Sequence, residues 1–104
     1  MKNIIRKIGI TSVIAKKDIG NIYGAVLACF LEKNTDNCGI ILLLMKRSNG
    51  SLKPIAISDP VMNDDGKAYA FLDVSADDVY VSAEVRNSWN GKIISIDYNA
   101  KKSA

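Results

Sequence analysis

The 104-residue sequence contains no histidine. Histidine is the usual general base near neutral pH and a common ligand of zinc and iron, so its absence removes Ser-His-Asp and Cys-His catalysis and most zinc and iron sites. Gly20, Gly24 and Gly39 are scattered along the chain, which argues against a phosphate-binding glycine loop. We therefore expect a protein that is not an enzyme and that uses no cofactor.

Long hydrophobic runs are also missing. Apolar runs such as residues 40–45 are far too short to cross a membrane, so we expect no membrane span. The N-terminus begins with a positive charge like a secretion signal, but Arg6 and Lys7 interrupt its apolar run and Lys16 and Lys17 close it. We expect a chain made in the cytoplasm without a signal peptide, with secretion as the alternative.

Cysteine is scarce, and its spacing matches no redox or metal motif. Eight residues separate Cys29 from Cys38, and they include a polar segment. A simple hairpin centred between residues 33 and 34 would place the two side chains opposite each other. Reduced thiols on two apolar strands and a disulfide are both compatible with this arrangement.

Charge is distributed unevenly along the chain. Residues 1–17 carry five basic side chains and no acid, whereas residues 59–84 carry seven acids and a single lysine. The basic segment can be a solvated terminus, or it can dock on an acidic patch of a neighbouring copy. Nucleic acid is a weaker candidate partner because the segment has no aromatic side chain to stack on a base.

Most of the chain has the composition of β-strands divided by turns. Seven strands are predicted, at residues 8–14, 22–31, 38–45, 52–58, 67–74, 79–86 and 92–98. Their spacing favours an all-β sandwich, in which residues 21–100 form the domain and residues 101–104 a tail. Residues 1–20 are then a basic N-terminal arm or a first strand. A helix or disorder remains an alternative for residues 1–14.

The segment from residue 63 to residue 86 has the strongest hairpin pattern in the sequence. Gly66 follows two aspartates in a turn, and the next residues alternate in the way that suits a half-buried strand. A second polar turn at residues 75–78 leads into a strand in which Val79, Val81 and Val85 share one face. This pattern predicts a β-hairpin of two antiparallel strands.

Two loops contain residues that could carry a function. The acidic loop at residues 59–66 lacks the ligand spacing of a calcium site and is interpreted as a plain turn. Trp89 lies in the predicted loop between the last two strands. A large ring there can anchor an interface, or it can fold back over the end of the sandwich.

The hairpin pattern also resembles a known family. An Asp-x-x-Gly-x-Tyr-x-Phe pattern, a polar turn and a following Tyr-Val are typical of the carboxypeptidase regulatory-like domain, a seven-stranded transthyretin-like sandwich of Ig-like type. The pattern is carried here by Asp64 or Asp65, Gly66, Tyr69, Phe71, Tyr80 and Val81. Residues 22–98 are more specifically similar to the N-terminal domain of prophage side tail fibre proteins.

Three short segments carry that second similarity. They are Gly24-Ala25-Val26, Asn37-Cys38 and Lys46-Arg47. The chain departs from the pattern at Asp78-Val79, where a glycine is usual before the second tyrosine. The resemblance implies a sandwich that serves as a structural protein in a phage tail, with a virion or another assembled particle as its location.

These observations predict a non-enzymatic, protein-binding structural subunit that associates with further copies of itself. The basic arm of one copy is expected to meet an acidic face of the next, and Trp89 is a further candidate contact. The predicted interface residues are Lys2, Arg6, Lys7, Lys16, Lys17, Asp59, Asp64, Asp65, Asp77, Asp78 and Trp89. The alternatives are a small inhibitor or regulator that binds a host enzyme and an exported adhesion module.

Overall fold

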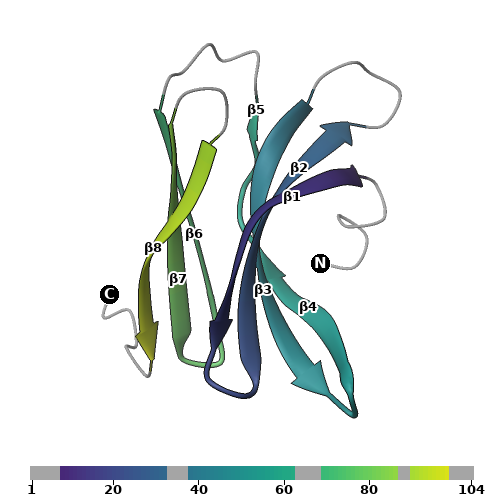
Figure 1. Ribbon diagram of the computed structural model, residues 1–104, viewed down its shortest axis with the longest axis vertical. Helices are drawn as coiled ribbons and strands as arrows, with labels where there is room; N and C mark the ends of the chain where they lie inside the picture. The colour runs from purple at the N-terminus through teal and green to yellow at the C-terminus, as the bar shows by residue number, and fades with distance from the viewer. Residues whose placement is uncertain (1–7, 33–37, 63–68, 87–89, 99–104) are drawn as a thin grey trace.

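The computed structural model describes residues 8–32, 38–62, 69–86 and 90–98, which form two antiparallel sheets (Figure 1). The larger sheet has the strand order β1 (Ile8–Ile19), β2 (Tyr23–Glu32), β3 (Cys38–Ser48) and β4 (Ser51–Ile57), and β5 (Val61–Met62) also pairs with β3. The smaller sheet has the order β6 (Tyr69–Ala76), β7 (Val79–Arg86) and β8 (Asn90–Tyr98). The predicted all-β sandwich is confirmed.

The described residues contain eight strands where seven were predicted. The additional strand, β5, has two residues and follows Pro60, so it is too short to give an alternating pattern in the sequence. The first strand is also longer than predicted, because β1 continues to Ile19. Two register shifts in β1 allow it to follow β2 while Ile14, Ala15 and Ile19 all reach the core side.

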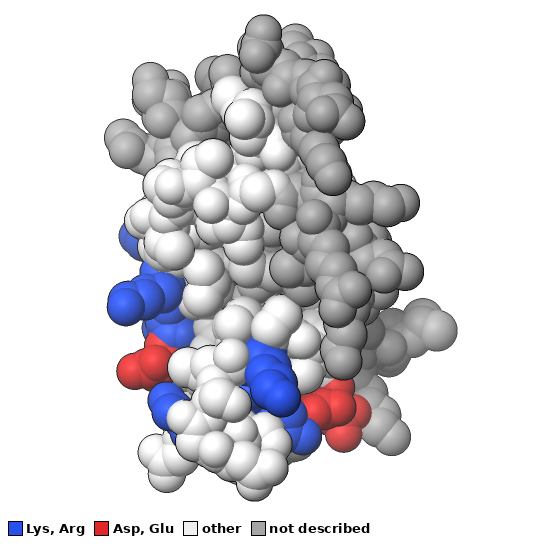
Figure 2. All heavy atoms as spheres, turned by 90° about the vertical axis from the view of Figure 1, so that its right-hand side faces the viewer, with Lys and Arg blue, Asp and Glu red and all other residues white. Residues whose placement is uncertain are grey.

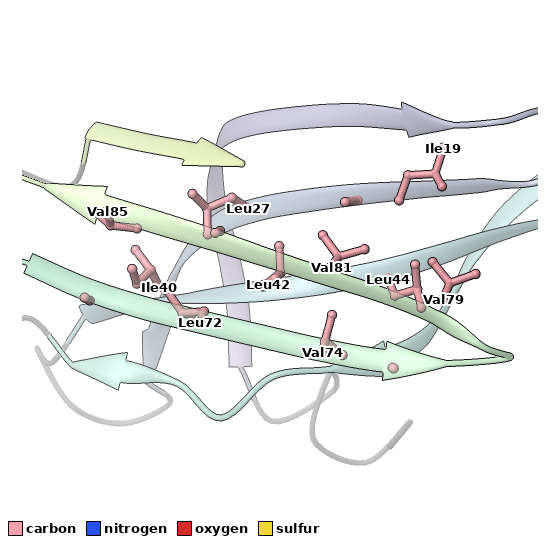
Figure 3. Packing of buried hydrophobic residues seen from close by; sticks show 14 residues of the cluster. Ile19, Leu27, Ile40, Leu42, Leu44, Leu72, Val74, Val79, Val81 and Val85 are labelled. Carbon is pink, nitrogen blue, oxygen red and sulfur yellow. The ribbon is translucent and has the colours of Figure 1, made fainter. Parts of the chain in front are cut away.

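The main core lies between the two sheets, where the apolar faces of alternating strands meet. In Figure 3, Leu27 and Leu42 from the larger sheet point toward Val81 and Val85 from the smaller one. The buried members of this core are Ile19, Ala25, Leu27, Ile40, Leu42, Leu44, Ala56, Ala70, Leu72, Val74, Val79, Val81, Ala83 and Val85. Apolar burial of this kind contributes about 1.5–3 kcal/mol for each large side chain.

A second, smaller apolar cluster lies on the outer side of the larger sheet. Its buried members are Ala28, Phe30, Ile41 and Leu43, which alternate along β2 and β3 with the residues that face the main core. β2 and β3 are therefore apolar on both faces, which explains their nearly continuous apolar sequence. In the part of the chain that the structure describes, no helix has the length and apolarity of a membrane span.

Strands of the two sheets also approach each other along both sides of the sandwich. β8 lies beside β1 on one side of the sandwich, and β6 lies beside β3 and β4 on the other. The turn between β3 and β4 has positive φ at both Asn49 and Gly50, which is the two-residue hairpin geometry that matches strand twist. These connections bring the turns β1–β2, β3–β4 and β6–β7 to the same end of the molecule (Figure 1).

Candidate protein-binding surfaces

The acidic turn between β6 and β7 is a tight two-residue loop. Ala76 pairs with Val79, and the two residues between them, Asp77 and Asp78, have φ values of 52° and 64°. Aspartate tolerates this left-handed region better than most residues because its short side chain can bond locally. Both predicted interface carboxylates are therefore presented at the end of the sandwich.

Asp77 is bound within its own chain. Its carboxylate accepts hydrogen bonds from the ammonium of Lys46 at 3.1 Å and the hydroxyl of Tyr23 at 3.2 Å. Tyr23 and Lys46 are cross-strand partners on β2 and β3, and the Lys46 ammonium lies 5.7 Å from the centre of the Tyr23 ring. The contact therefore joins the larger sheet to the turn of the smaller one, whereas Asp78 is exposed.

These contacts change the acid–base properties of the groups involved. The hydrogen bond from Lys46, followed by that from Tyr23, lowers the pKa of Asp77 below its ordinary value of 3.8. The same bond to Asp77 raises the pKa of Lys46 above 10.5. Because both side chains are exposed to solvent, we expect the ion pair to fix the geometry of this end more than it stabilises the fold.

Lowering the pH should weaken this contact, because the Asp77 carboxylate loses its charge when it binds a proton. A carboxyl whose pKa is lower in the folded chain than in the unfolded chain contributes stability above its unfolded pKa, and that contribution is lost as the pH falls through the folded pKa. We expect Asp77→Asn to reduce the loss of stability on acidification at pH values below 3.8. Urea unfolding at a series of pH values measures this slope.

The matched control for this prediction is Asp97→Asn, which removes an exposed carboxylate near the end of β8. Its stability curve should run parallel to that of the native chain over the same pH range. Identical acid sensitivity in the native chain and in Asp77→Asn would show that the Lys46–Asp77 contact does not contribute in solution.

Lys16 and Lys17 lie on β1, beside a groove on the outer side of the larger sheet. The groove has a volume of about 340 Å³ and combines cationic, acidic and apolar walls. Its lining residues are Lys16, Lys17, Asp18, Gly24, Ala25, Val26, Met45 and Leu52. Figure 2 shows this side of the molecule, where uncharged side chains cover most of the described surface and charged ones gather toward the lower end.

Apolar side chains continue from this groove along the outer side of β1 and β4. Val13 is 56% exposed and Leu52 is 46% exposed, and Ile10 is exposed as well. Val13 and Ile10 are the cross-strand partners of Ala28 and Phe30, so they lie at the border of the smaller apolar cluster. Apolar side chains that form a contiguous patch on the surface are a feature of protein-binding sites.

Asp59 lies at a different place, between the edges of the two sheets. It lines a groove of about 300 Å³ whose walls are residues 56–59, at the end of β4, and residues 73–75 of β6. Ser58 shapes this wall because its buried hydroxyl accepts a hydrogen bond from the Leu42 amide at 2.9 Å and donates one to the Asp59 carbonyl. Asp73 lines the opposite wall, and its carboxylate accepts a hydrogen bond from the Tyr80 hydroxyl.

The outer face of the smaller sheet carries aromatic residues that sequence reasoning did not assign to a surface. Phe71 is 49% exposed, and Tyr69 beside it donates a hydrogen bond to Glu84 at 3.0 Å. The Arg86 guanidinium lies 5.2 Å from the centre of the Tyr69 ring and also pairs with Glu84. The alternation of these rings with Ala70, Leu72 and Val74 is the signal that could have placed them outside.

The structure divides the predicted interface residues among separate surfaces. Lys16 and Lys17 share one groove, Asp77 and Asp78 share one turn, and Asp59 lies near Asp73 instead. The remaining predicted residues, Lys2, Arg6, Lys7, Asp64, Asp65 and Trp89, lie outside the described residues.

The two cysteines have a different register from the one predicted. Cys29 pairs with Ile40 and Cys38 pairs with Leu31, so the expected direct pairing is wrong by two residues, and no disulfide joins the two thiols. Such a shift keeps every side chain on the same face of the sheet, so the apolar pattern does not reveal it. Among the described residues, no three cysteine or acidic side chains gather as a metal site requires.

The chain was compared with known protein families, curated proteins and solved structures. No protein-family model, no curated protein and no solved structure matches the chain.

Proposed function

We propose that this protein is a non-enzymatic structural subunit that binds other copies of itself. The observation that carries the proposal is the groove beside Lys16 and Lys17, where two exposed cations adjoin the apolar side chains of Val26, Met45 and Leu52. A surface of this composition suits a protein partner that brings both acidic and apolar groups. A phage or phage-like tail or surface assembly is the setting that the sequence resemblance suggests.

The same chain offers acidic groups that could complement this groove. Asp78 is exposed at the tip of the β6–β7 turn, and Asp59 is exposed between the sheet edges. Both lie on surfaces other than the basic groove, so a contact between basic and acidic surfaces joins two different patches. Contacts of this heterologous kind close into rings or extend into filaments.

Reversing the charge of the groove should disrupt self-association. In Lys16→Glu/Lys17→Glu, the acidic surface of the next copy would meet two like charges, and we expect the association constant to fall by about tenfold or more. Sedimentation velocity over a range of protein and salt concentrations measures the effect. Self-association of the native chain should also weaken as salt increases, because screening reduces contacts between exposed charges.

The control is Lys53→Glu/Lys92→Glu, which changes the net charge equally at exposed lysines of β4 and β8 outside the groove. It should associate like the native chain. A truncation through residue 17 is unsuitable, because it would remove most of β1 and its contribution to the core. A native chain that stays monomeric at every concentration would refute the proposed function.

A further inference from the structure

The strands that border the two sheets differ in how well their free edges are protected against pairing. β1 has two register shifts and exposes Lys16 and Lys17, and β4 contains Pro54, which has no amide hydrogen to donate. β8 carries Lys92 and a register shift opposite Ser82 and Ala83. Bulges, lysines and prolines at sheet edges are the features by which proteins avoid unwanted strand addition.

β6 has none of these features. Its eight residues pair with β7 in unbroken register from Tyr69 to Ala76, and Asp73 is their single charged residue. β7 is its one strand neighbour in the smaller sheet, so its other edge is free of pairing within the described residues. A long and regular free edge of this kind is a template for main-chain hydrogen bonding to an added strand.

The space beside that edge has the chemistry of a site for a basic segment. The groove of about 300 Å³ runs between β6 and the end of β4, and Asp59 and Asp73 are among the residues that line its two walls. The partly buried Ile55 and Val61 pack on the core from β4 and β5, on the same side of the sandwich. Because Leu72 and Val74 face the core, Asp73 faces the other side of β6, so an added strand would have the apolar core on one face and the Asp73 side chain on the other.

We propose that the free edge of β6 binds residues 1–7 of a second copy as an additional antiparallel or parallel strand. This inference rests on the proposed self-association and specifies one of its contacts. The occupant is chosen by charge complementarity, since residues 1–7 contain three cations and no acid. The same segment contains Ile4 and Ile5, whose side chains would point to opposite faces of an extended strand.

The length of the N-terminal segment favours binding between two copies over binding of residues 1–7 to β6 of the same copy. β1 and β4 are the opposite ends of the strand order in the larger sheet, separated by three strand spacings of about 4.8 Å. An extended chain spans about 3.4 Å per residue, so about four of residues 1–7 would be used to cross that sheet within the same copy. Too few residues would remain to pair along β6.

A labelled peptide with the sequence of residues 1–7 tests this contact directly. We expect saturable binding to the full chain by fluorescence anisotropy, weakened by salt. Hydrogen exchange should show slower exchange of β6 amides when the peptide is bound, because an added strand accepts hydrogen bonds from the free edge. No binding up to about 1 mM peptide, or protection confined to another strand, would overturn the inference.

Substitutions in the groove distinguish specific binding of the peptide from general charge attraction. Asp59→Asn/Asp73→Asn keeps the side-chain shapes, and the amide at position 73 can still accept the Tyr80 hydrogen bond. We expect it to weaken peptide binding by about tenfold. Asp97→Asn, on the same sheet but on β8, should change binding less than about twofold. Equal effects of both variants would contradict a site beside β6.

Self-association of the same variants distinguishes this inference from the proposed function. Deleting residues 2–7 leaves β1 in place, so the shortened chain should lose the donor segment and still bind the peptide. If assembly depends on Lys16 and Lys17 but is unchanged by this deletion and by Asp59→Asn/Asp73→Asn, the β6 contact is refuted and the proposed function stands. If the peptide binds β6 while the full chain stays monomeric, a second copy is refuted as the occupant.

Discussion

Leu42→Ala is expected to lower the free energy of unfolding by about 3–4 kcal/mol. The side chain of Leu42 is 0% exposed, on the strand β3, which is paired on both sides. It points into the layer between the sheets, near Val81 in Figure 3. Truncation would remove apolar contacts and leave a cavity that two rigid sheets cannot easily close.

Urea unfolding followed by circular dichroism measures this loss. The control is Leu52→Ala, which makes the same chemical change at a side chain that is 46% exposed on β4. We expect it to cost less than about 1 kcal/mol. A similar loss in both variants would mean that β3 does not form the centre of the core. Since single domains are stable by about 5–15 kcal/mol, the expected effect of Leu42→Ala is a large fraction of the total.

Gly39→Ala is expected to destabilise the chain by about 2–3 kcal/mol, because it adds an atom where there is no space for one. A Cβ atom at residue 39 would lie 2.5 Å from the carbonyl oxygen of Val61 and 3.0 Å from the ring of Phe30. The Val61 oxygen belongs to the backbone of β5, which pairs with β3 at this position. β5 would therefore have to move away from β3, and the pairing of Val61 and Met62 would be lost.

Hydrogen exchange at Val61 and Met62, together with urea unfolding, tests this expectation. Gly9→Ala is the matched control because Gly9 is also in a strand, and nothing lies within 4 Å of the position of its added Cβ. It should be neutral or slightly stabilising, since alanine loses less backbone freedom on folding. Unchanged exchange at β5 in Gly39→Ala would show that β5 is not held against β3 in solution.

The strands themselves could be predicted closely from the sequence. The predicted strand at residues 79–86 coincides with β7, and the other predicted strands each overlap one observed strand. Alternation between apolar and polar residues is a local property, because successive side chains point to opposite faces. β5 was missed because two residues carry no periodicity, and the end of β1 was missed because Lys16 and Lys17 resemble the end of a strand.

The candidate surfaces could be predicted only in part. Lys16 and Lys17 were identified from their charge, but their neighbours Met45 and Leu52 come from strands distant in the sequence. Asp77 was predicted to lie at an interface, and its contacts with Lys46 and Tyr23 within the chain were not predicted. Charge patterns identify which residues are ionic and do not indicate which opposite charge the fold brings near them.

The sequence by itself therefore determined the fold class and the faces of the strands. The tertiary structure decided the register of β2 with β3, since a shift of two residues leaves every side chain on the same face. It also decided that β6, with its regular pairing to β7, has no second strand neighbour among the described residues and lies beside the groove that Asp59 and Asp73 line. Strand order and register depend on contacts between residues far apart in the chain, which local periodicity does not encode.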